Sequence, residues 1–224
     1  MFIMEVFCIK KLLYIPVSPK PEEMSTSKTV GRAFVNRFRN KNPDYMIEEI
    51  DLYTHDIPEI NHKLFNGRAE PVSGEEYDAL SEEEKRQVDI INTLCEQFLS
   101  ADVYVIAAPM WSVSFPSRLK RYVDCVVINN RTISITPEEV KGLLDDKERR
   151  MVYIQSSGGI YPKILSAKYN HGIEYFKDIF KFLGVKKFES ILVQGVDKPE
   201  VGKEKAIDEA YEDMEKVIEK VSIV

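Results

Sequence analysis

The chain carries a group of hydroxyl residues, Ser18 followed by Ser25, Thr26 and Ser27, just ahead of a segment with helical periodicity. Hydroxyl groups and the free amides at the start of a helix form a natural anion site. The group has neither the GxGxxG pattern of a dinucleotide fingerprint nor the GxxxxGK[ST] pattern of a P-loop. It therefore suits a phosphate monoester that is held in place better than one that is transferred. Alternatively, one hydroxyl caps the helix and the others face solvent.

A second segment places Met110, Trp111, Ser112 and Val113 directly after an apolar run, and Trp111 is the only tryptophan in the chain. A flat aromatic ligand could lie against this loop, with backbone amides reaching its heteroatoms. Alternatively, Trp111 covers the end of a sheet or belongs to a subunit contact, since tryptophan is enriched at interfaces.

A third segment, Ser156, Ser157, Gly158 and Gly159, also follows an apolar run and leads to Tyr161. Paired glycines allow the backbone to approach a ligand closely, or to adopt a positive φ in a turn. The plain alternative is a tight connection without a ligand. The joint occurrence of the three segments is a more specific indication of a ligand site than any one of them alone.

The stretches that must position these segments show the pattern of a parallel sheet with crossover helices. The predicted strands are residues 11–17, 46–52, 102–108, 151–155 and 190–195. This pattern favours an α/β, flavodoxin-like fold: a doubly wound, five-stranded parallel sheet of order 2-1-3-4-5 with helices on both faces. In such folds ligands bind at the carboxyl ends of the inner strands, where all three candidate segments begin.

We expect a single domain over residues 1–224, with residues 1–10 as a loose extension. Residues 53–80 are interpreted as an irregular excursion, with room for a short helix, and such long connections tend to carry function. The S-x-x-E pattern at 81–84 predicts a capping box at the start of a helix. The mixed-charge run 145–150 is interpreted as a solvated loop.

Composition narrows the classes of partner. The chain has 224 residues, with 31 basic and 37 acidic side chains and a formal charge of -6, which disfavours nucleic acid. Cys8, Cys95 and Cys125 lack paired spacing, which favours the reducing cytoplasm. His55 and His62 lack the spacing of metal ligands, so we predict no metal site. No apolar run has the length of a membrane span.

Three parts of the chain resemble the FMN-dependent NADH:azoreductase and quinone reductase family. They are the loop at 18–27, called here the serine-bearing loop, and the segments A-A-P-M-W-S-V-S-F-P-S-R-L-K-R-Y-V-D and Q-S-S-G-G-I-Y. The resemblance runs from about residue 11 to the C-terminal helix and includes D-L-Y after the second strand. It implies a homodimer that binds FMN noncovalently.

By position, the resemblance implies a set of residues that contact FMN through its phosphate, its ring system and the third loop. They are Ser18, Ser25, Thr26, Ser27, Met110, Trp111, Ser112, Val113, Ser156, Ser157, Gly158 and Gly159. The family often has Asn at the place of Ser112 and Arg at the place of Ser157. Backbone contacts should survive both differences.

The implied reaction transfers a hydride from NADH or NADPH to FMN and then reduces a quinone, azo or nitroaromatic acceptor in ping-pong order. Because the flavin carries the chemistry, no side chain is expected to be an obligatory acid or base. Trp111, Tyr161 and the excursion are candidates for the acceptor pocket. The alternative is a flavodoxin-type electron carrier, which would not oxidise NADH by itself.

Overall fold

The computed structural model describes residues 9–161 and 169–223, so the predicted extension at 1–10 lies almost wholly outside the described residues. The centre of the fold is a five-stranded parallel sheet with the order β2-β1-β5-β8-β9, which confirms the predicted 2-1-3-4-5 arrangement. Its strands are β1 (Lys11–Pro16), β2 (Met46–Glu49), β5 (Val103–Pro109), β8 (Arg150–Ser157) and β9 (Lys187–Gln194).

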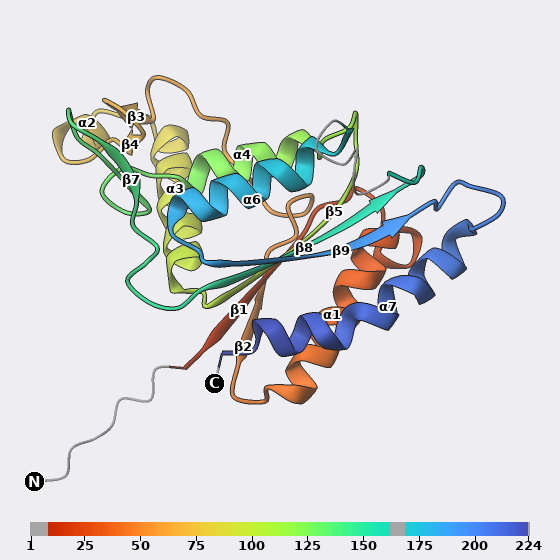
Figure 1. The fold of residues 1–224 in the computed structure, drawn as a ribbon. Helices are drawn as coiled ribbons and strands as arrows, with labels where there is room; N and C mark the ends of the chain where they lie inside the picture. The colour runs from red at the N-terminus through yellow and green to blue at the C-terminus, as the bar shows by residue number, and fades with distance from the viewer. Residues whose placement is uncertain (1–8, 162–168, 224) are drawn as a thin grey trace, which may run out of the picture.

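Helices cover both faces of the sheet (Figure 1). One face carries α1 (Thr26–Lys41) and α7 (Gly202–Val221). The other carries α3 (Glu82–Ser100), α4 (Ser117–Val126) and α6 (His171–Leu183). The inner strands β1 and β5 are apolar and buried on both sides, as expected for parallel strands between two helical layers.

Local sequence signals explain two of the helix ends. Ser81 and Glu84 form the predicted capping box at the start of α3, each side chain bonding to the backbone of the other residue. At the end of α6, Gly184 has a φ of 110°, the left-handed conformation that glycine adopts most easily.

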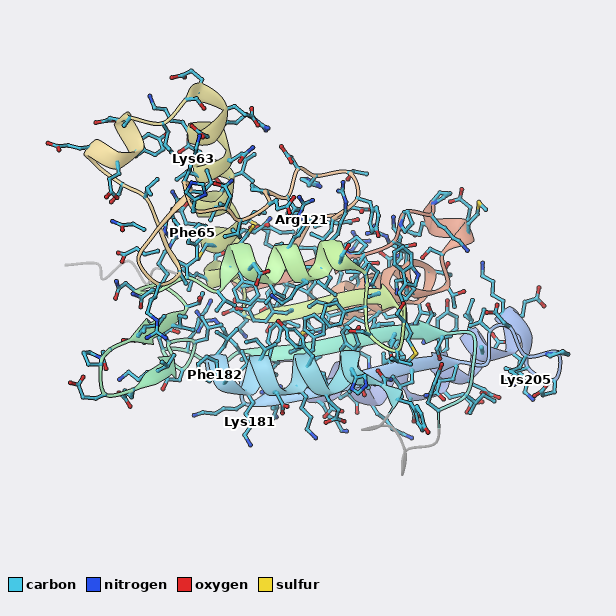
Figure 2. All side chains as sticks on the ribbon, turned by 90° about the horizontal axis from the view of Figure 1, so that it is seen from above. Lys63, Phe65, Arg121, Lys181, Phe182 and Lys205 are labelled. Carbon is cyan, nitrogen blue, oxygen red and sulfur yellow. The ribbon has the colours of Figure 1, made fainter. Side chains whose placement is uncertain are left out.

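The excursion at 53–80 contains a short helix, as its sequence allowed, and a small hairpin that was not predicted. It contains a small hairpin of β3 (Phe65–Asn66) and β4 (Glu70–Pro71), followed by the short helix α2 (Glu75–Asp78). Its Ile57, Leu64 and Val72 are buried in the core, while Lys63 and Phe65 lie beside α3 (Figure 2). These apolar anchors attach the excursion to the α3 face of the sheet.

Two parts of the structure differ from expectation beyond small shifts of strand ends. The hairpin of β6 (Ile133–Ile135) and β7 (Val140–Gly142) was not predicted, because both strands are only three residues long. The run 145–150 is not fully solvated. Arg149 and Arg150 are buried. Arg149 pairs with the Asp146 carboxylate and donates hydrogen bonds to the carbonyls of Leu144 and Leu99, so a charged partner and backbone acceptors together compensate for its burial.

Within the described part of the chain, none of the helices combines the length and the apolar character that a membrane span requires.

Candidate functional site

Strand register brings the three candidate segments to one edge of the sheet. Pro16 of β1 is paired with Ala107 of β5, and Pro109 of β5 is paired with Ser156 of β8. The chains that leave these strands therefore start at nearly the same level. The Met110 amide also donates to the Ser156 carbonyl at 2.7 Å, which ties the second segment to the third.

The three segments line a common cleft of about 200 Å³. Eight of the predicted cofactor-binding residues line it: Ser18, Ser25, Thr26, Met110, Trp111, Ser156, Ser157 and Gly158. The loop after β1 thus contributes hydroxyls and the start of a helix to the cleft. The loop after β5 contributes the apolar pair Met110 and Trp111, and the end of β8 contributes a serine–glycine turn.

The serine-bearing loop reaches the cleft through the start of α1. A single turn of 3-10 helix (Glu22–Met24) precedes the helix, and Ser25 is its N-cap, accepting from the Lys28 amide at 3.5 Å. The first amides of a helix have no carbonyl partner within the helix, and here they belong to Thr26 and Ser27. This is the arrangement that holds an anion.

The second segment forms a tight two-residue turn, closed by backbone hydrogen bonds between Trp111 and Ser114 in both directions. The turn residues Ser112 and Val113 have φ values of 48° and 57°. Such values are unfavourable for a β-branched residue, so the turn is strained at Val113. The Val113 carbonyl accepts from the amide of His171, so the start of α6 holds the turn in place.

The third segment is held almost entirely by backbone contacts. The carbonyls of Ser157, Gly158 and Gly159 accept hydrogen bonds from the amides of 195–197, directly after β9. A steric reason favours glycine at position 158, because a Cβ there would overlap the Asp197 carboxylate. A side chain at this position would therefore require the Asp197 carboxylate to move.

Several predicted residues do not line the cleft. Ser27 is fully buried behind it, and the other three, Ser112, Val113 and Gly159, lie in the turns that shape its walls. Tyr161 lines a separate cavity beside β9 and α7, and its amide donates to the Gln194 side chain at 2.8 Å.

Sequence reasoning missed six residues of the cleft, namely Pro19, Lys20, Met24, Pro109, Val196 and Asp197. Pro19, Lys20 and Met24 belong to the serine-bearing loop, so their place in the sequence could have indicated them. Val196 and Asp197 follow β9, a strand from which the sequence predicted no site residue. Their amides bond to the third segment, and no sequence motif marks that contact.

The structure also accounts for the thiols. Burial raises the pKa of Cys95 to about 11 and that of Cys125 to about 12. Both thiols are therefore protonated at neutral pH, and the thiolate is the reactive form. Neither cysteine lines the cleft, and both are buried in the α3 and α4 layer.

Comparison with known proteins shows similarity along almost the whole chain. A family model described as a flavodoxin-like fold matches residues 10–218. A protein of Clostridium acetobutylicum named FMN-dependent NADH:quinone oxidoreductase 1 is 54% identical over 215 residues, which cover 96% of this chain and 97% of the relative. A Ruminiclostridium cellulolyticum protein named FMN-dependent NADH:quinone oxidoreductase is 44% identical, with 95% and 100% of the two chains covered.

A solved structure is also similar to this chain over almost its whole length. An FMN-dependent NADH-azoreductase from Bacillus anthracis in complex with FMN has a TM-score of 0.82 and 27% identity, covering 96% of this chain and all of its own. The order of the sheet, the position of the cleft and these similarities agree. The chain therefore belongs to the family of FMN-dependent NADH:quinone oxidoreductases, which has the flavodoxin-like fold.

Proposed function

We propose that the protein is an FMN-dependent oxidoreductase that uses NADH to reduce quinones and azo or nitroaromatic compounds. The observation that carries this proposal is the meeting of three loops in one cleft at the carboxyl edge of the sheet. The proposal agrees with the printed names of the relatives, which specify FMN, NADH and quinone.

The chemistry of the cleft fits FMN. One part of it offers the Ser25 hydroxyl and the free amides at the start of α1, which suit a phosphate. Met110 and Trp111 offer an apolar surface for a flat ring system, and the Trp111 side chain is 44% exposed. Gly158 contributes only backbone to this wall, because a Cβ there would overlap the Asp197 carboxylate.

When FMN is bound, it supplies the transfer of two electrons from NADH to the acceptor. In our proposal the serine-bearing loop holds the phosphate. Ser18, Ser25 and Thr26 contribute from the lining of the cleft, and Ser27 contributes through its amide in the first turn of α1. Lys20, whose amide donates to the Ser18 hydroxyl, adds a positive charge at the rim. The protein's part is therefore to bind and orient, and we assign no residue as an acid or a base.

The ring system is proposed to lie against the second and third segments. Met110, Trp111, Ser112 and Val113 would present backbone groups to its heteroatoms from the strained turn. Ser156, Ser157, Gly158 and Gly159 would do the same from the other wall. Because the carbonyls of 157–159 are already bonded to 195–197, the third segment has a fixed shape before any ligand binds.

The decisive experiment combines binding with turnover. FMN is titrated into the purified protein while flavin and tryptophan fluorescence are followed, and NADH oxidation is then measured with FMN and a simple quinone. We expect saturable binding and quinone-dependent loss of NADH absorbance. Absence of any flavin binding would refute the proposal. Binding without NADH oxidation would favour the alternative, a flavodoxin-type electron carrier.

The order of the two half-reactions is a further part of the proposal. We propose that NADH and the acceptor use the cleft in turn, in a ping-pong order in which the nicotinamide leaves before the acceptor enters. Initial rates at several fixed acceptor concentrations should then give parallel double-reciprocal lines. Intersecting lines would contradict this order.

Trp111 is proposed to form one wall of the acceptor pocket. Trp111→Ala should change the ratio of kcat/KM values for a small quinone and a bulky azo compound. Phe182→Ala is a matched control, because Phe182 is 42% exposed and lies at the end of α6 away from the cleft (Figure 2). Unchanged acceptor preference and flavin affinity in the Trp111 variant would count against this role.

We propose a homodimer with the Trp111 region in the contact. The exposed Trp111 and Val113 side chains, at 44% and 40% exposure, form an apolar projection that association would cover. Sedimentation at micromolar concentration with FMN should give the dimer mass, and a monomer would contradict the proposal.

We also propose that residues 1–224 act as one domain in the cytoplasm, where the buried Cys95 and Cys125 would remain reduced.

A further inference from the structure

A buried lysine lies directly behind the serine-bearing loop. The Lys28 side chain is 11% exposed, and Lys28 does not line the cleft although Ser18 and Lys20 do. Its ammonium group donates to the Asp51 carboxylate at 2.6 Å, to the Lys20 carbonyl at 3.2 Å and to the Ser18 carbonyl at 3.5 Å. The three protons of the ammonium group are thus matched by three acceptors.

These contacts determine which backbone groups the loop turns away from the cleft. Because Lys28 lies behind the loop, the carbonyls of Ser18 and Lys20 that bond to it are directed away from the cleft. A site for a phosphate dianion must present N–H groups and hydroxyls, since carbonyl oxygens directed at the anion would repel it. The ammonium group therefore holds two unfavourable dipoles out of the site.

Asp51 fixes the position of the lysine. Its side chain is 15% exposed, and its second carboxylate oxygen accepts from the Tyr53 amide at 2.9 Å. The carboxylate neutralises the buried ammonium, which would otherwise be costly to bury. Asp51 lies just beyond β2, so the pair links the neighbouring edge of the sheet to the loop after β1.

We propose that Lys28 is a positioning residue for the phosphate of FMN: it sets the orientation of the Ser18–Lys20 backbone and makes this loop specific for a phosphorylated flavin. The inference rests on the proposed function. It assigns Lys28 no contact with the flavin ring or the acceptor. Its effect should consequently appear in the comparison of FMN with riboflavin, which lacks the phosphate.

The test measures the dissociation constants of FMN and riboflavin by fluorescence titration for the wild type and for Lys28→Met. The variant keeps the length of the side chain but removes the charge and the donors. We expect FMN binding to weaken by about tenfold or more, the usual scale for losing a charged hydrogen-bonding group. Riboflavin binding should change by less than about twofold on the same scale.

The chain provides a matched control at the opposite end of the sheet. The Lys147 ammonium group donates to the Ser100 carbonyl at 2.8 Å and forms an ion pair with the Asp102 carboxylate at 2.7 Å. Lys147→Met removes a similar, partly buried pair far from the cleft. It should lower the unfolding temperature without changing the ratio of FMN affinity to riboflavin affinity.

A second variant keeps the inference testable if Lys28→Met does not fold. Asp51→Asn keeps the lysine but removes the carboxylate that fixes its ammonium group, so the Ser18 and Lys20 carbonyls should be held less firmly. The preference for FMN over riboflavin should therefore fall, and a preference equal to that of the wild type would overturn the inference.

For Lys28→Met, unchanged FMN affinity, or equal weakening of FMN and riboflavin binding, would also overturn the inference. Failure of the wild type to bind FMN would instead refute the proposed function. The two failures are therefore distinguishable.

Discussion

Replacing Gly31 by alanine should displace the helix that carries the phosphate site. Gly31 lies in α1 where the helix crosses β1 and β5. A Cβ at this position would come within 2.5 Å of the Tyr14 hydroxyl and 2.7 Å of the Ala107 Cβ. Non-bonded heavy atoms prefer separations of about 3.5–4.0 Å, so relief of both contacts requires the helix to retreat by about 1 Å.

The expected energy follows from two opposing effects. Overpacking of this kind costs about 1–3 kcal/mol, whereas alanine gains about 1 kcal/mol over glycine inside a helix. We therefore expect Gly31→Ala to lower the free energy of unfolding by about 1 kcal/mol, or a few degrees in Tm for a chain of this size. FMN binding should weaken as well, because the start of α1 would move with the helix.

The assay pairs thermal unfolding without flavin with FMN titration. Asn36→Ala is the control, because Asn36 is exposed on the same helix and the change gains helix propensity without a clash. Adding Tyr14→Phe to Gly31→Ala removes the nearest contacting atom and should recover part of the lost FMN affinity. If Gly31→Ala is at least as stable as the wild type and binds FMN equally well, the packing argument is wrong.

Three further predictions concern the helix cap, the strained turn and the thiols. Ser25→Ala should reduce the free energy of unfolding by about 1 kcal/mol or less, since the capping bond is long, and should weaken FMN binding. Denaturant titration and FMN titration measure the two effects, and no loss in either would contradict the role of this cap. Val113→Gly should raise the unfolding midpoint by relieving about 1 kcal/mol of backbone strain, and a lower midpoint would show that the turn is not strained. The thiols of Cys95 and Cys125 have pKa values of about 11 and 12 in the folded state, above the value of about 8.5 expected for an unfolded chain. Their contribution to the free energy of unfolding is therefore full below about pH 8.5 and is lost as the pH rises through the folded values. Unfolding free energies at increasing pH should fall more steeply for the wild type than for Cys95→Ala/Cys125→Ala, by up to about 1.4 kcal/mol per pH unit for each thiol, and equal slopes would contradict this.

The sequence was sufficient for the order of the sheet and for the three loops, because both depend on local patterns. Apolar runs identify strands that are buried on both faces, and the ligand edge of a parallel sheet follows from its topology. The positions of Ser18, Met110 and Ser156 at one edge could therefore be predicted before the register was known. Only the structure shows that the strand pairs align them.

The remainder of the site depends on contacts that have no local signature. Asp197 joins the cleft because the amides after β9 bond to the third loop, and nothing in the neighbouring sequence indicates that pairing. Tyr161 follows the third loop in sequence but lines a separate cavity beside β9 and α7, and no local pattern indicates on which side of the loop it lies. Nothing in the sequence around Lys28 marks its position, because two of its acceptors belong to the loop after β1 and the third, Asp51, follows β2.

The backbone hydrogen bonds between 157–159 and 195–197 bear on how this protein can evolve. They depend only on peptide groups, so the anchoring of the third loop to the chain after β9 does not require a particular side chain at Ser157. The Ser157 hydroxyl adds one hydrogen bond within the loop, to the Gly159 carbonyl at 2.9 Å. Ser157, where the family often has Arg, is thus a position at which selection could adjust the polarity beside the cleft at the cost of one hydrogen bond while the backbone anchoring remains.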